Sequence, residues 1–225
     1  DNDSDIDTVI GNGYGQANKL YLNDGNGVFP SIGIPIGNKM DNTLSIALAD
    51  VDGDGDIDMV EGNVGQTNKL YLNDGSGSFS STGIDIASVT DAKFSISLAD
   101  MDNDGDMDLV LISHSRRYPN MLYINDGRNN FVPTSGLFEE TPGAIVLADV
   151  DSDGNIDMVT ADNLYLNDGS GNFLYSRTPL SFSSYLTSSV ALADMDGDGD
   201  LDIVHGKQLQ ANQLYLNDGS GEFTS

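Results

Sequence analysis

The chain has 225 residues, of which 38% are hydrophobic, and its 36 acidic and 9 basic residues give a formal charge of -27. This length is enough for a sizeable core. So acidic a surface repels phosphate backbones and anionic lipids, which argues against nucleic acid as a partner and against membrane insertion. No apolar run approaches the length of a membrane span, and without cysteine there is no disulfide framework.

One repeat is written five times along the chain. The string LADVDGDGDIDMV at residues 48–60 returns with small changes at 98–110, 147–159 and 192–204, and a truncated copy opens the chain at Asp1. Each acidic string is followed by a second motif of the form LYLNDG. Two linked motifs in five copies indicate a repeat architecture within a single domain, residues 1–225. The repeats cover approximately residues 1–40, 41–90, 91–139, 140–184 and 185–225.

Each repeat is expected to form four short strands, as the second repeat shows in chain order. Residues 43–50 and 69–73 alternate between apolar and other side chains, with the period of two that is typical of strands. Residues 57–62 form a short strand between them, 73–77 have the composition of a hairpin turn, and 78–86 make the fourth strand. Four strands in about 45–50 residues predict an all-β fold, a β-propeller of five four-stranded blades.

The WD40 and kelch signatures of other propellers are absent, and the chain has no tryptophan. A β-helix would need a much shorter repeat. We expect the five blades to close into a small ring. The alternative is a sector of a larger ring, which would leave sheet faces and edges exposed.

The acidic loop between the first and second strands of each repeat needs something to offset its charge. Bringing five carboxylates within a few ångströms costs several kcal/mol unless a cation balances them. Calcium suits such a loop, because it takes roughly six to eight oxygen ligands in flexible geometry. In the pattern D-x-D-x-D-G-x-x-D, we expect carboxylates at positions 1, 3, 5 and 9 and a backbone carbonyl at position 7 to bind the ion, while the glycine at position 6 allows a sharp turn. The predicted ligands are Asp50, Asp52, Asp54, Asp56, Asp58, Asp100, Asp102, Asp104, Asp106, Asp108, Asp149, Asp151, Asp153, Asn155, Asp157, Asp194, Asp196, Asp198, Asp200 and Asp202.

The first acidic loop differs from the other four. Asp1, Asp3, Asp5 and Asp7 fall at positions 3, 5, 7 and 9, so the first ligand is missing, and Ser4 replaces the glycine. We therefore expect four Ca²⁺ sites and leave a fifth, at this loop, open.

An EF-hand is the obvious rival, but it needs flanking helices and a glutamate at position 12 of its loop. Here strands flank the loop, and only the second repeat has glutamate at that position, as Glu61. The other repeats have Leu111, Thr160 and His205 there. We reject the EF-hand, which leaves metal-free turns rich in aspartate as the alternative to calcium loops.

The string DVDGDGDIDMV followed by NKLYLNDGSGSF resembles the FG-GAP/VCBS repeats of bacterial surface proteins. It is also similar in loop pattern to the calcium-binding blades of integrin α-subunit propellers. The resemblance covers five copies in series and implies a calcium-stabilised propeller on a secreted or cell-surface protein, as part of a larger surface protein or assembly. The integrin Phe-Gly and Gly-Ala-Pro signatures are missing, so integrin-like ligand binding is not implied.

The loops between the second and third strands vary most and are candidates for binding a ligand. Amide side chains and an aromatic ring suit the hydroxyls and faces of sugars, and similar sites around a ring would bind multivalently. We therefore expect a non-enzymatic adhesion or ligand-binding module for an extracellular glycan or protein, with simple hairpin chemistry as the alternative for these residues. The candidates are Tyr14, Gln16, Asn18, Gln66, Asn68, Gln208 and Asn212.

The third of these variable loops offers an alternative function. It carries His114, Arg116, Arg117 and Tyr118, and such groups could serve as acid, base and carboxylate-neutralising cations in a polysaccharide lyase. A divergent surface loop explains them equally. His205 stands alone and is expected to pack or lie on the surface. No other catalytic motif is present, so we expect no enzymatic activity.

Overall fold

The computed structural model describes residues 1–38, 40–86, 93–113, 120–134, 144–160, 163–176, 187–208 and 210–224. All regular secondary structure in these residues is β-strand. They contain no helix long and apolar enough to cross a membrane. The strands form five antiparallel sheets, each of which falls within one of the five repeats and is called a blade below.

The first two blades show the pattern. Blade 1 consists of β1 (Thr8–Ile10), β2 (Lys19–Tyr21) and β3 (Ile34–Pro35). Blade 2 consists of β4 (Thr43–Ala49), β5 (Asp58–Asn63), β6 (Asn68–Tyr71) and β7 (Ile84–Ile86). Neighbouring strands in the sequence pair in each sheet, so every blade is a simple meander. The prediction of four strands is wrong for blade 1, which has three strands that correspond to the second, third and fourth strands of the other blades.

The remaining blades have four strands each. Blade 3 consists of β8 (Lys93–Ala99), β9 (Asp108–Ser113), β10 (Met121–Asn125) and β11 (Phe131–Pro133). Blade 4 consists of β12 (Ile145–Ala148), β13 (Asp157–Thr160), β14 (Leu164–Asn167) and β15 (Phe173–Tyr175). Blade 5 consists of β16 (Thr187–Ala193), β17 (Asp202–Lys207), β18 (Gln213–Asn217) and β19 (Phe223–Thr224).

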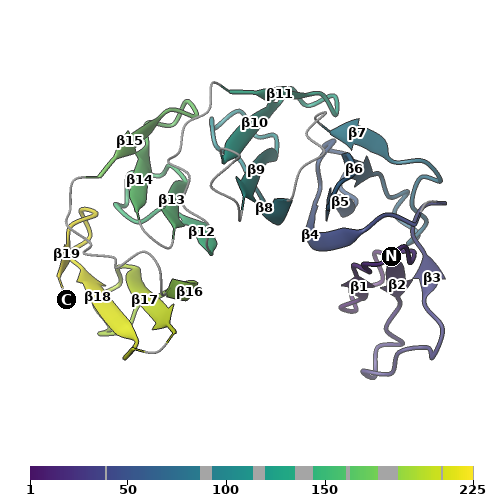
Figure 1. Ribbon diagram of the computed structural model, residues 1–225, viewed down its shortest axis with the longest axis horizontal. Helices are drawn as coiled ribbons and strands as arrows, with labels where there is room; N and C mark the ends of the chain where they lie inside the picture. The colour runs from purple at the N-terminus through teal and green to yellow at the C-terminus, as the bar shows by residue number, and fades with distance from the viewer. Residues whose placement is uncertain are drawn as a thin grey trace.

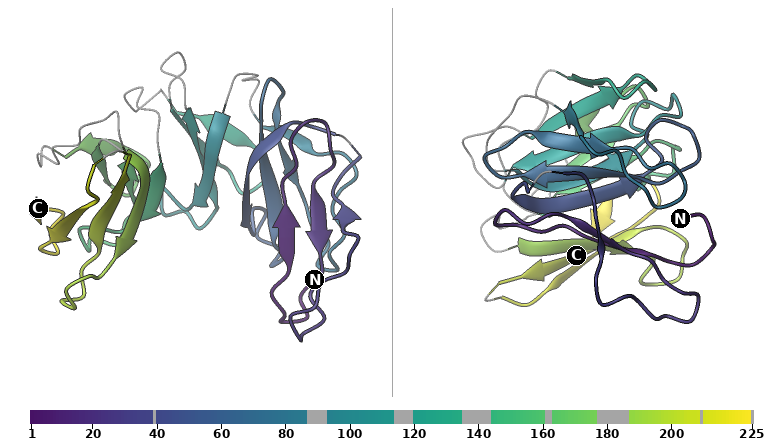
Figure 2. Two further views of the ribbon diagram at one scale, coloured as in Figure 1. Left: turned by 60° about the horizontal axis from the view of Figure 1, so that its bottom comes forward. Right: turned by 90° about the vertical axis from the view of Figure 1, so that its right-hand side faces the viewer.

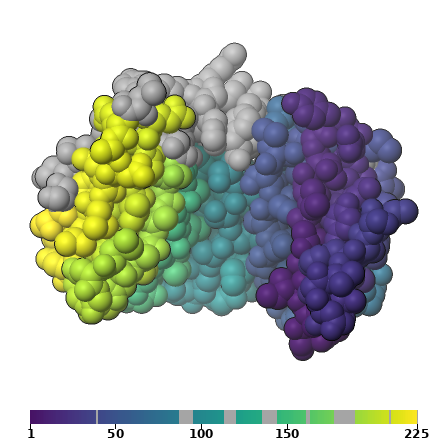
Figure 3. Space-filling view, turned by 90° about the horizontal axis from the view of Figure 1, so that it is seen from below, coloured from purple at the N-terminus to yellow at the C-terminus, as the bar shows by residue number. Residues whose placement is uncertain are grey.

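The blades stand side by side in an arc, with the first strand of each four-stranded blade at the centre and the fourth outside (Figure 1). Two further views show the blades as separate sheets that fan out along the arc (Figure 2). Blades 1 and 5 form separate masses at the two ends of the arc (Figure 3). The architecture is propeller-like, but the expected small closed ring is not seen. The angle between neighbouring blades is set by the side chains packed between them, and it leaves an open sector.

The apolar core lies between blades. The LYL motif explains why, because alternate residues of a strand point to opposite faces of its sheet. In blade 3, Leu122 packs against blade 4 while Tyr123 packs against blade 2. Both side chains are at most 2% exposed. Each blade therefore needs a neighbour on both sides to bury its apolar surface.

Candidate metal centres

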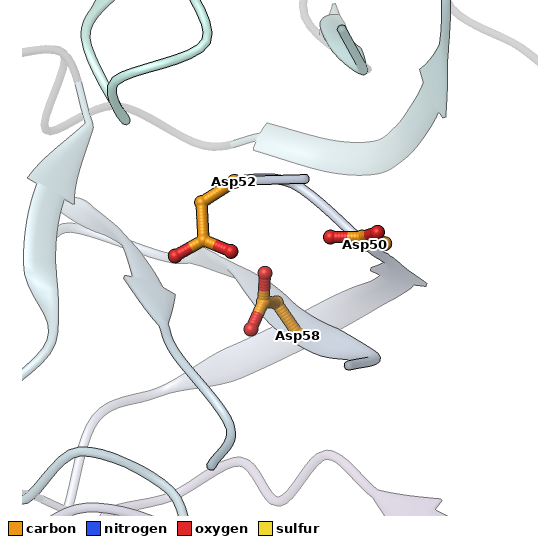
Figure 4. A group of neighbouring side chains, drawn as sticks. All are labelled: Asp50, Asp52 and Asp58. Atoms are coloured by element: carbon orange, nitrogen blue, oxygen red, sulfur yellow. The ribbon is translucent and has the colours of Figure 1, made fainter. Parts of the chain in front are cut away.

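The acidic loops join the first and second strands of blades 2 to 5, and the ninth loop residue is the first residue of the second strand. Three carboxylates of each loop, those at positions 1, 3 and 9, have ligand atoms that all lie within 4.8 Å of one another. In blade 2, the carboxylates of Asp52 and Asp58 face each other and Asp50 lies beside them (Figure 4). The four groups are Asp50, Asp52 and Asp58; Asp100, Asp102 and Asp108; Asp149, Asp151 and Asp157; and Asp194, Asp196 and Asp202.

The ninth position anchors each loop to its sheet. Asp157 is 0% exposed. Its Oδ2 accepts a hydrogen bond from the backbone N–H of Val150 (2.9 Å), and its Oδ1 accepts one from the N–H of Asn167 on β14 (2.8 Å). The same pair of bonds forms at Asp58, Asp108 and Asp202. One carboxylate thus joins the loop, the second strand and the third strand.

The first position closes the loop around the cluster. Asp50 accepts hydrogen bonds from the N–H groups of Gly53 (2.8 Å) and Gly55 (3.0 Å). Gly55 has a φ of +93°, and the equivalent glycines of the other three loops lie between +90° and +102°. This backbone conformation is costly for a residue with a Cβ atom, which explains the glycine at position 6.

The side chains at positions 5 and 7 lie outside the group of three carboxylates. The fifth-position carboxylate accepts the N–H of position 7, as Asp54 does from Asp56 (2.9 Å), and it is not part of the three-residue group. The seventh side chain points toward the hairpin between the third and fourth strands, where a Cβ on Gly75 would lie 2.7 Å from Asp56. Ligand roles for Asp54, Asp104, Asp153 and Asp198, and carbonyl roles for Asp56, Asp106, Asn155 and Asp200, stay predictions.

The pKa values of aspartates in the acidic loops and in the hairpin turns are shifted in opposite directions. Burial, and next to it the charges of neighbouring aspartates, raise the pKa of Asp108 and of Asp157 to about 6. In the exposed hairpin turns, hydrogen bonds instead lower the pKa of two aspartates: for Asp74 they come from the hydroxyl and the backbone N–H of Ser76, and for Asp168 from the backbone N–H of Ser170 and the side chain of Asn172. The hydrogen bonds of the turn therefore stabilise the ionised hairpin carboxylates. At Asp108 and Asp157, by contrast, the hydrogen bonds do not offset the cost of burying the charge.

The donor set fits a hard divalent cation. Three carboxylates converge, and in blades 2 and 3 one oxygen of the third-position residue, Oδ1 of Asp52 and Oδ1 of Asp102, is buried without a hydrogen-bond partner. A buried carboxylate oxygen in this state is costly unless a cation or a proton reaches it. Carboxylate oxygens on a flexible, glycine-containing loop are what Ca²⁺ prefers.

The first loop is less complete. Asp3 Oδ1 accepts the N–H of Asp5 (2.9 Å), and Asp7 Oδ1 accepts the N–H of Asn23 (2.8 Å), as in the other blades. Asp1, Asp3, Asp5 and Asp7 do not form a three-carboxylate group of the kind found in the other four loops.

The family model of the FG-GAP-like repeat matches residues 1–61, 50–111 and 149–205. The chain belongs to the FG-GAP-like repeat family. No curated protein matches the sequence.

Two solved structures align with this chain of FG-GAP-like blades. An Agrocybe aegerita lectin, described as specifically recognising non-reducing terminal N-acetylglucosamine, aligns with a TM-score of 0.68 at 18% identity, over 93% of this chain and 60% of the lectin chain. The V. cholerae biofilm matrix protein Bap1 aligns with a TM-score of 0.41 at 22% identity, over 81% of this chain and 30% of Bap1. The chain therefore spans less than two thirds of either protein. At such identity, the lectin alignment supports the fold alone.

The candidate ligand residues lie at the end of the blades opposite the acidic loops, and the structure divides them. Asn18 and Asn68 are at most 4% exposed. Their amide oxygens close the loops before the third strands, by accepting the N–H of Asn12 (2.7 Å) and of Asn63 (3.0 Å). Asn212 does the same for Lys207 (3.1 Å), but is exposed.

Gln66 links the loop between β5 and β6 to the segment just before β4, because its side-chain amide donates to Asp41 (2.8 Å). Gln16 and Gln208 are exposed, and Tyr14 is 97% exposed on a residue with φ +58°. Its N–H donates to Asn42, a residue of the next repeat (2.8 Å). The alternative site at 114–118 lies outside the described residues.

Sequence reasoning missed a second role for the asparagine of the LYLND motif, which was assigned to hairpin chemistry. The side-chain amide of Asn167 donates to the carbonyl of Ile156 in its own loop (3.0 Å) and to the carbonyl of Met101 in the loop of the preceding blade (2.8 Å). Asn125 and Asn217 make the same pair of bonds. The recurrence of this asparagine in all five repeats was the available signal.

A buried polar cluster between blades 1 and 2 was also missed. Glu61 is 2% exposed. Its Oε1 accepts from Asn63 (2.8 Å) and its Oε2 from Asn18 of blade 1 (2.7 Å). Burial, reinforced by the neighbouring carboxylate of Asp41, raises the pKa of Glu61 to about 7.

Proposed function

We propose that this chain is part of a calcium-stabilised, extracellular propeller that serves as a non-enzymatic adhesion or ligand-binding module. The observation that carries the proposal is the group of three convergent aspartates found at the same place in four consecutive blades. Sites of this kind suit the calcium concentration outside cells, where modules with dissociation constants of about 10⁻⁴–10⁻³ M are filled. The proposed location is secreted or at the cell surface, in a bacterium and within a larger surface assembly, as the resemblance to the FG-GAP/VCBS repeats of bacterial surface proteins implies.

The role proposed for calcium is structural. The ninth-position aspartate, which would bind the ion, also ties the loop to the second and third strands. An ion bound there would hold these parts of the blade together. Each site filled at 100 times its dissociation constant would add roughly 2.7 kcal/mol to the free energy of unfolding.

For the ligand, a glycan is the first candidate. In blade 1, the exposed Tyr14 ring can stack on a sugar face and the exposed amide of Gln16 can bond sugar hydroxyls. At the corresponding loop of blade 5, the exposed amides of Gln208 and Asn212 can do the same for another sugar unit. A lectin with the same fold supports the choice, although its sugar does not transfer at 18% identity. A protein ligand is the other outcome of the same test.

A glycan array probed in millimolar calcium, and again in EDTA, tests the proposal. We expect selective, calcium-dependent binding that Tyr14→Ala weakens at least tenfold. Tyr175→Ala is the matched control, because Tyr175 is also exposed (58%) but lies on β15, outside the variable loops. A blank array on protein shown to be folded would exclude the glycan, and equal losses in the two variants would exclude Tyr14 as a contact.

A further inference from the structure

One hairpin turn departs from the repeat. The turn between the third and fourth strands reads Asn-Asp-Gly-x-Gly in four of the five blades, but in blade 3 its fifth residue is Asn129. The φ of Asn129 is +63°, and the glycines in its place lie between +68° and +78°; they are Gly27, Gly77, Gly171 and Gly221. The backbone of the turn is therefore the same in all five blades. Blade 3 differs by a side chain, added in a conformation that suits glycine better.

The other junctions between blades show what lies opposite this side chain. At three of them, a Cβ atom on the turn glycine would contact the Cβ of the third-position aspartate in the acidic loop of the preceding blade. The pairs are Gly77 with Asp1 (3.4 Å), Gly171 with Asp102 (3.9 Å) and Gly221 with Asp151 (3.2 Å). The other nearest atoms belong to leucine and isoleucine side chains of the preceding blade. In the same register, Asn129 faces Asp52 of blade 2.

A hydrogen bond places the turn of blade 3 in the same way as its equivalents. The side-chain amide of Asn125, the first residue of that turn, donates to the carbonyl of Val51 (2.9 Å), and the equivalent bond forms at the next two junctions. Val51 directly precedes Asp52 in the acidic loop. The turn of blade 3 therefore lies over the acidic loop of blade 2, with Asn129 beside Asp52.

Two side-chain oxygens in this contact have no donor. Oδ1 of Asn129 and Oδ1 of Asp52 are both buried, and neither accepts a hydrogen bond from the residues that the structure describes. Both atoms are acceptors, so neither can satisfy the other. A buried oxygen in this state costs free energy unless a donor or a cation reaches it. A cation between the two oxygens would satisfy both at once.

We propose that Asn129 of blade 3 supplies an additional oxygen ligand to the cation site of Asp50, Asp52 and Asp58 in blade 2. This rests on the calcium function proposed above. Amide carbonyl oxygens are among the ligands that Ca²⁺ takes, and the set of ligands sets the affinity of a site. The blade 2 site is then the tightest of the four. The ion bound there also joins two blades, whereas the ions of the other sites hold the strands of a single blade.

Asparagine in a turn has a plainer explanation, because it tolerates a positive φ better than most residues with a side chain. Asn103, with a φ of +60°, is such a case, but its amide is used to donate to Asn155 (2.7 Å). A second explanation turns the amide of Asn129 by 180°, so that its NH₂ group donates to Asp52 and stabilises the metal-free site. The three explanations predict different results for one substitution.

Calcium titrations of the wild type and of Asn129→Gly test the proposal. Both proteins are stripped with a chelator, the bound ions are counted by native mass spectrometry, and calorimetry gives the dissociation constants. We expect four ions in both proteins, with the tightest dissociation constant raised about tenfold in Asn129→Gly. In EDTA the variant should unfold at the same or a higher urea concentration, because glycine suits the turn and removes a buried oxygen without a donor.

Two further variants assign the effect to a site. In a protein that already carries Asp52→Asn, adding Asn129→Gly should change none of the remaining dissociation constants, because the two residues act on the same ion. Gly171→Asn is the matched gain of ligand. Its side chain would face Asp102, whose Oδ1 is also buried without a donor. We expect it to tighten one further site, that of blade 3.

Two results would overturn the proposal. One is unchanged calcium affinity in Asn129→Gly with equal or higher stability in EDTA, because asparagine then only replaces glycine in the turn. The other is unchanged affinity with lower stability in EDTA, because the amide then donates to Asp52. These results are distinct from failure of the proposed function, in which the folded wild type itself binds no calcium.

Discussion

Replacing Asp157 with asparagine separates the structural role of the ninth loop position from its proposed role as a calcium ligand. In the metal-free protein at pH 7.5, the buried carboxylate is ionised, and its pKa of about 6, against the usual 3.8 for aspartate, corresponds to a cost of up to about 3 kcal/mol. The cost is smaller where water screens the loop. Asparagine removes this cost.

The same substitution introduces an opposing cost. Both carboxylate oxygens of Asp157 accept backbone N–H groups, from Val150 and from Asn167. Asparagine has one oxygen, so one N–H would face the amide NH₂ group, which costs about 1–3 kcal/mol. The two effects are of similar size, and we expect Asp157→Asn to change the free energy of unfolding in EDTA by no more than about 1 kcal/mol.

In saturating calcium the balance changes, because the site loses a charged ligand. We expect an additional loss of roughly 2.7 kcal/mol at a calcium concentration 100 times the dissociation constant of the intact site. Urea unfolding followed by tyrosine fluorescence measures this, since the chain has 9 tyrosines and no tryptophan. Asp168→Asn is the control, because Asp168 is an exposed hairpin residue of the same blade. An effect of Asp157→Asn that is equal in calcium and in EDTA would refute the reasoning.

Two further predictions concern junctions between blades. Asn167→Ala should lower the free energy of unfolding by about 2–4 kcal/mol with or without calcium, because the buried carbonyl of Met101 and the partly buried carbonyl of Ile156 lose their donor. Asn172→Ala in the exposed turn should cost about 0.5 kcal/mol, and equal losses in urea titrations would contradict the junction role. Burial raises the pKa of Glu61 above its unfolded value of 4.5 to about 7, so its contribution to stability is fully present below pH 4.5 and is lost as pH rises through 7. Between pH 5 and 8 the unfolding free energy of the wild type should therefore fall by up to about 3 kcal/mol more than that of Glu61→Gln, and parallel pH profiles would exclude the coupling.

The strands, the blades and the convergence of the first, third and ninth loop positions could be read from the sequence. Period-two alternation reports which residues share a face, and crowded like charges report a need for a cation. Repetition alone does not say what the side chain at position 5 contacts. Asp153 recurs as faithfully as Asp151, yet the structure uses its carboxylate to accept the N–H of Asn155 (2.8 Å) and leaves it outside the cluster.

Repetition in the sequence shows that a residue is needed, but it does not show which neighbouring group that residue contacts. Asn167 recurs because it serves a hairpin and a junction at once, and the second role needs the preceding blade to be in place. Asn68 was a reasonable candidate for a ligand contact from its place in a variable loop, but it is 0% exposed because the loop folds over it. The sequence left the choice between a closed ring and an open sector undecided, since the angle between blades depends on packing at each junction.

The content of bound calcium tests the central claim most directly. The protein is stripped with a chelator, dialysed against several millimolar calcium, and analysed by native mass spectrometry and by calorimetric titration. The account predicts about four ions per chain, one for each of the four aspartate groups, and three after Asp157→Asn. A folded protein that binds no calcium under these conditions would contradict it.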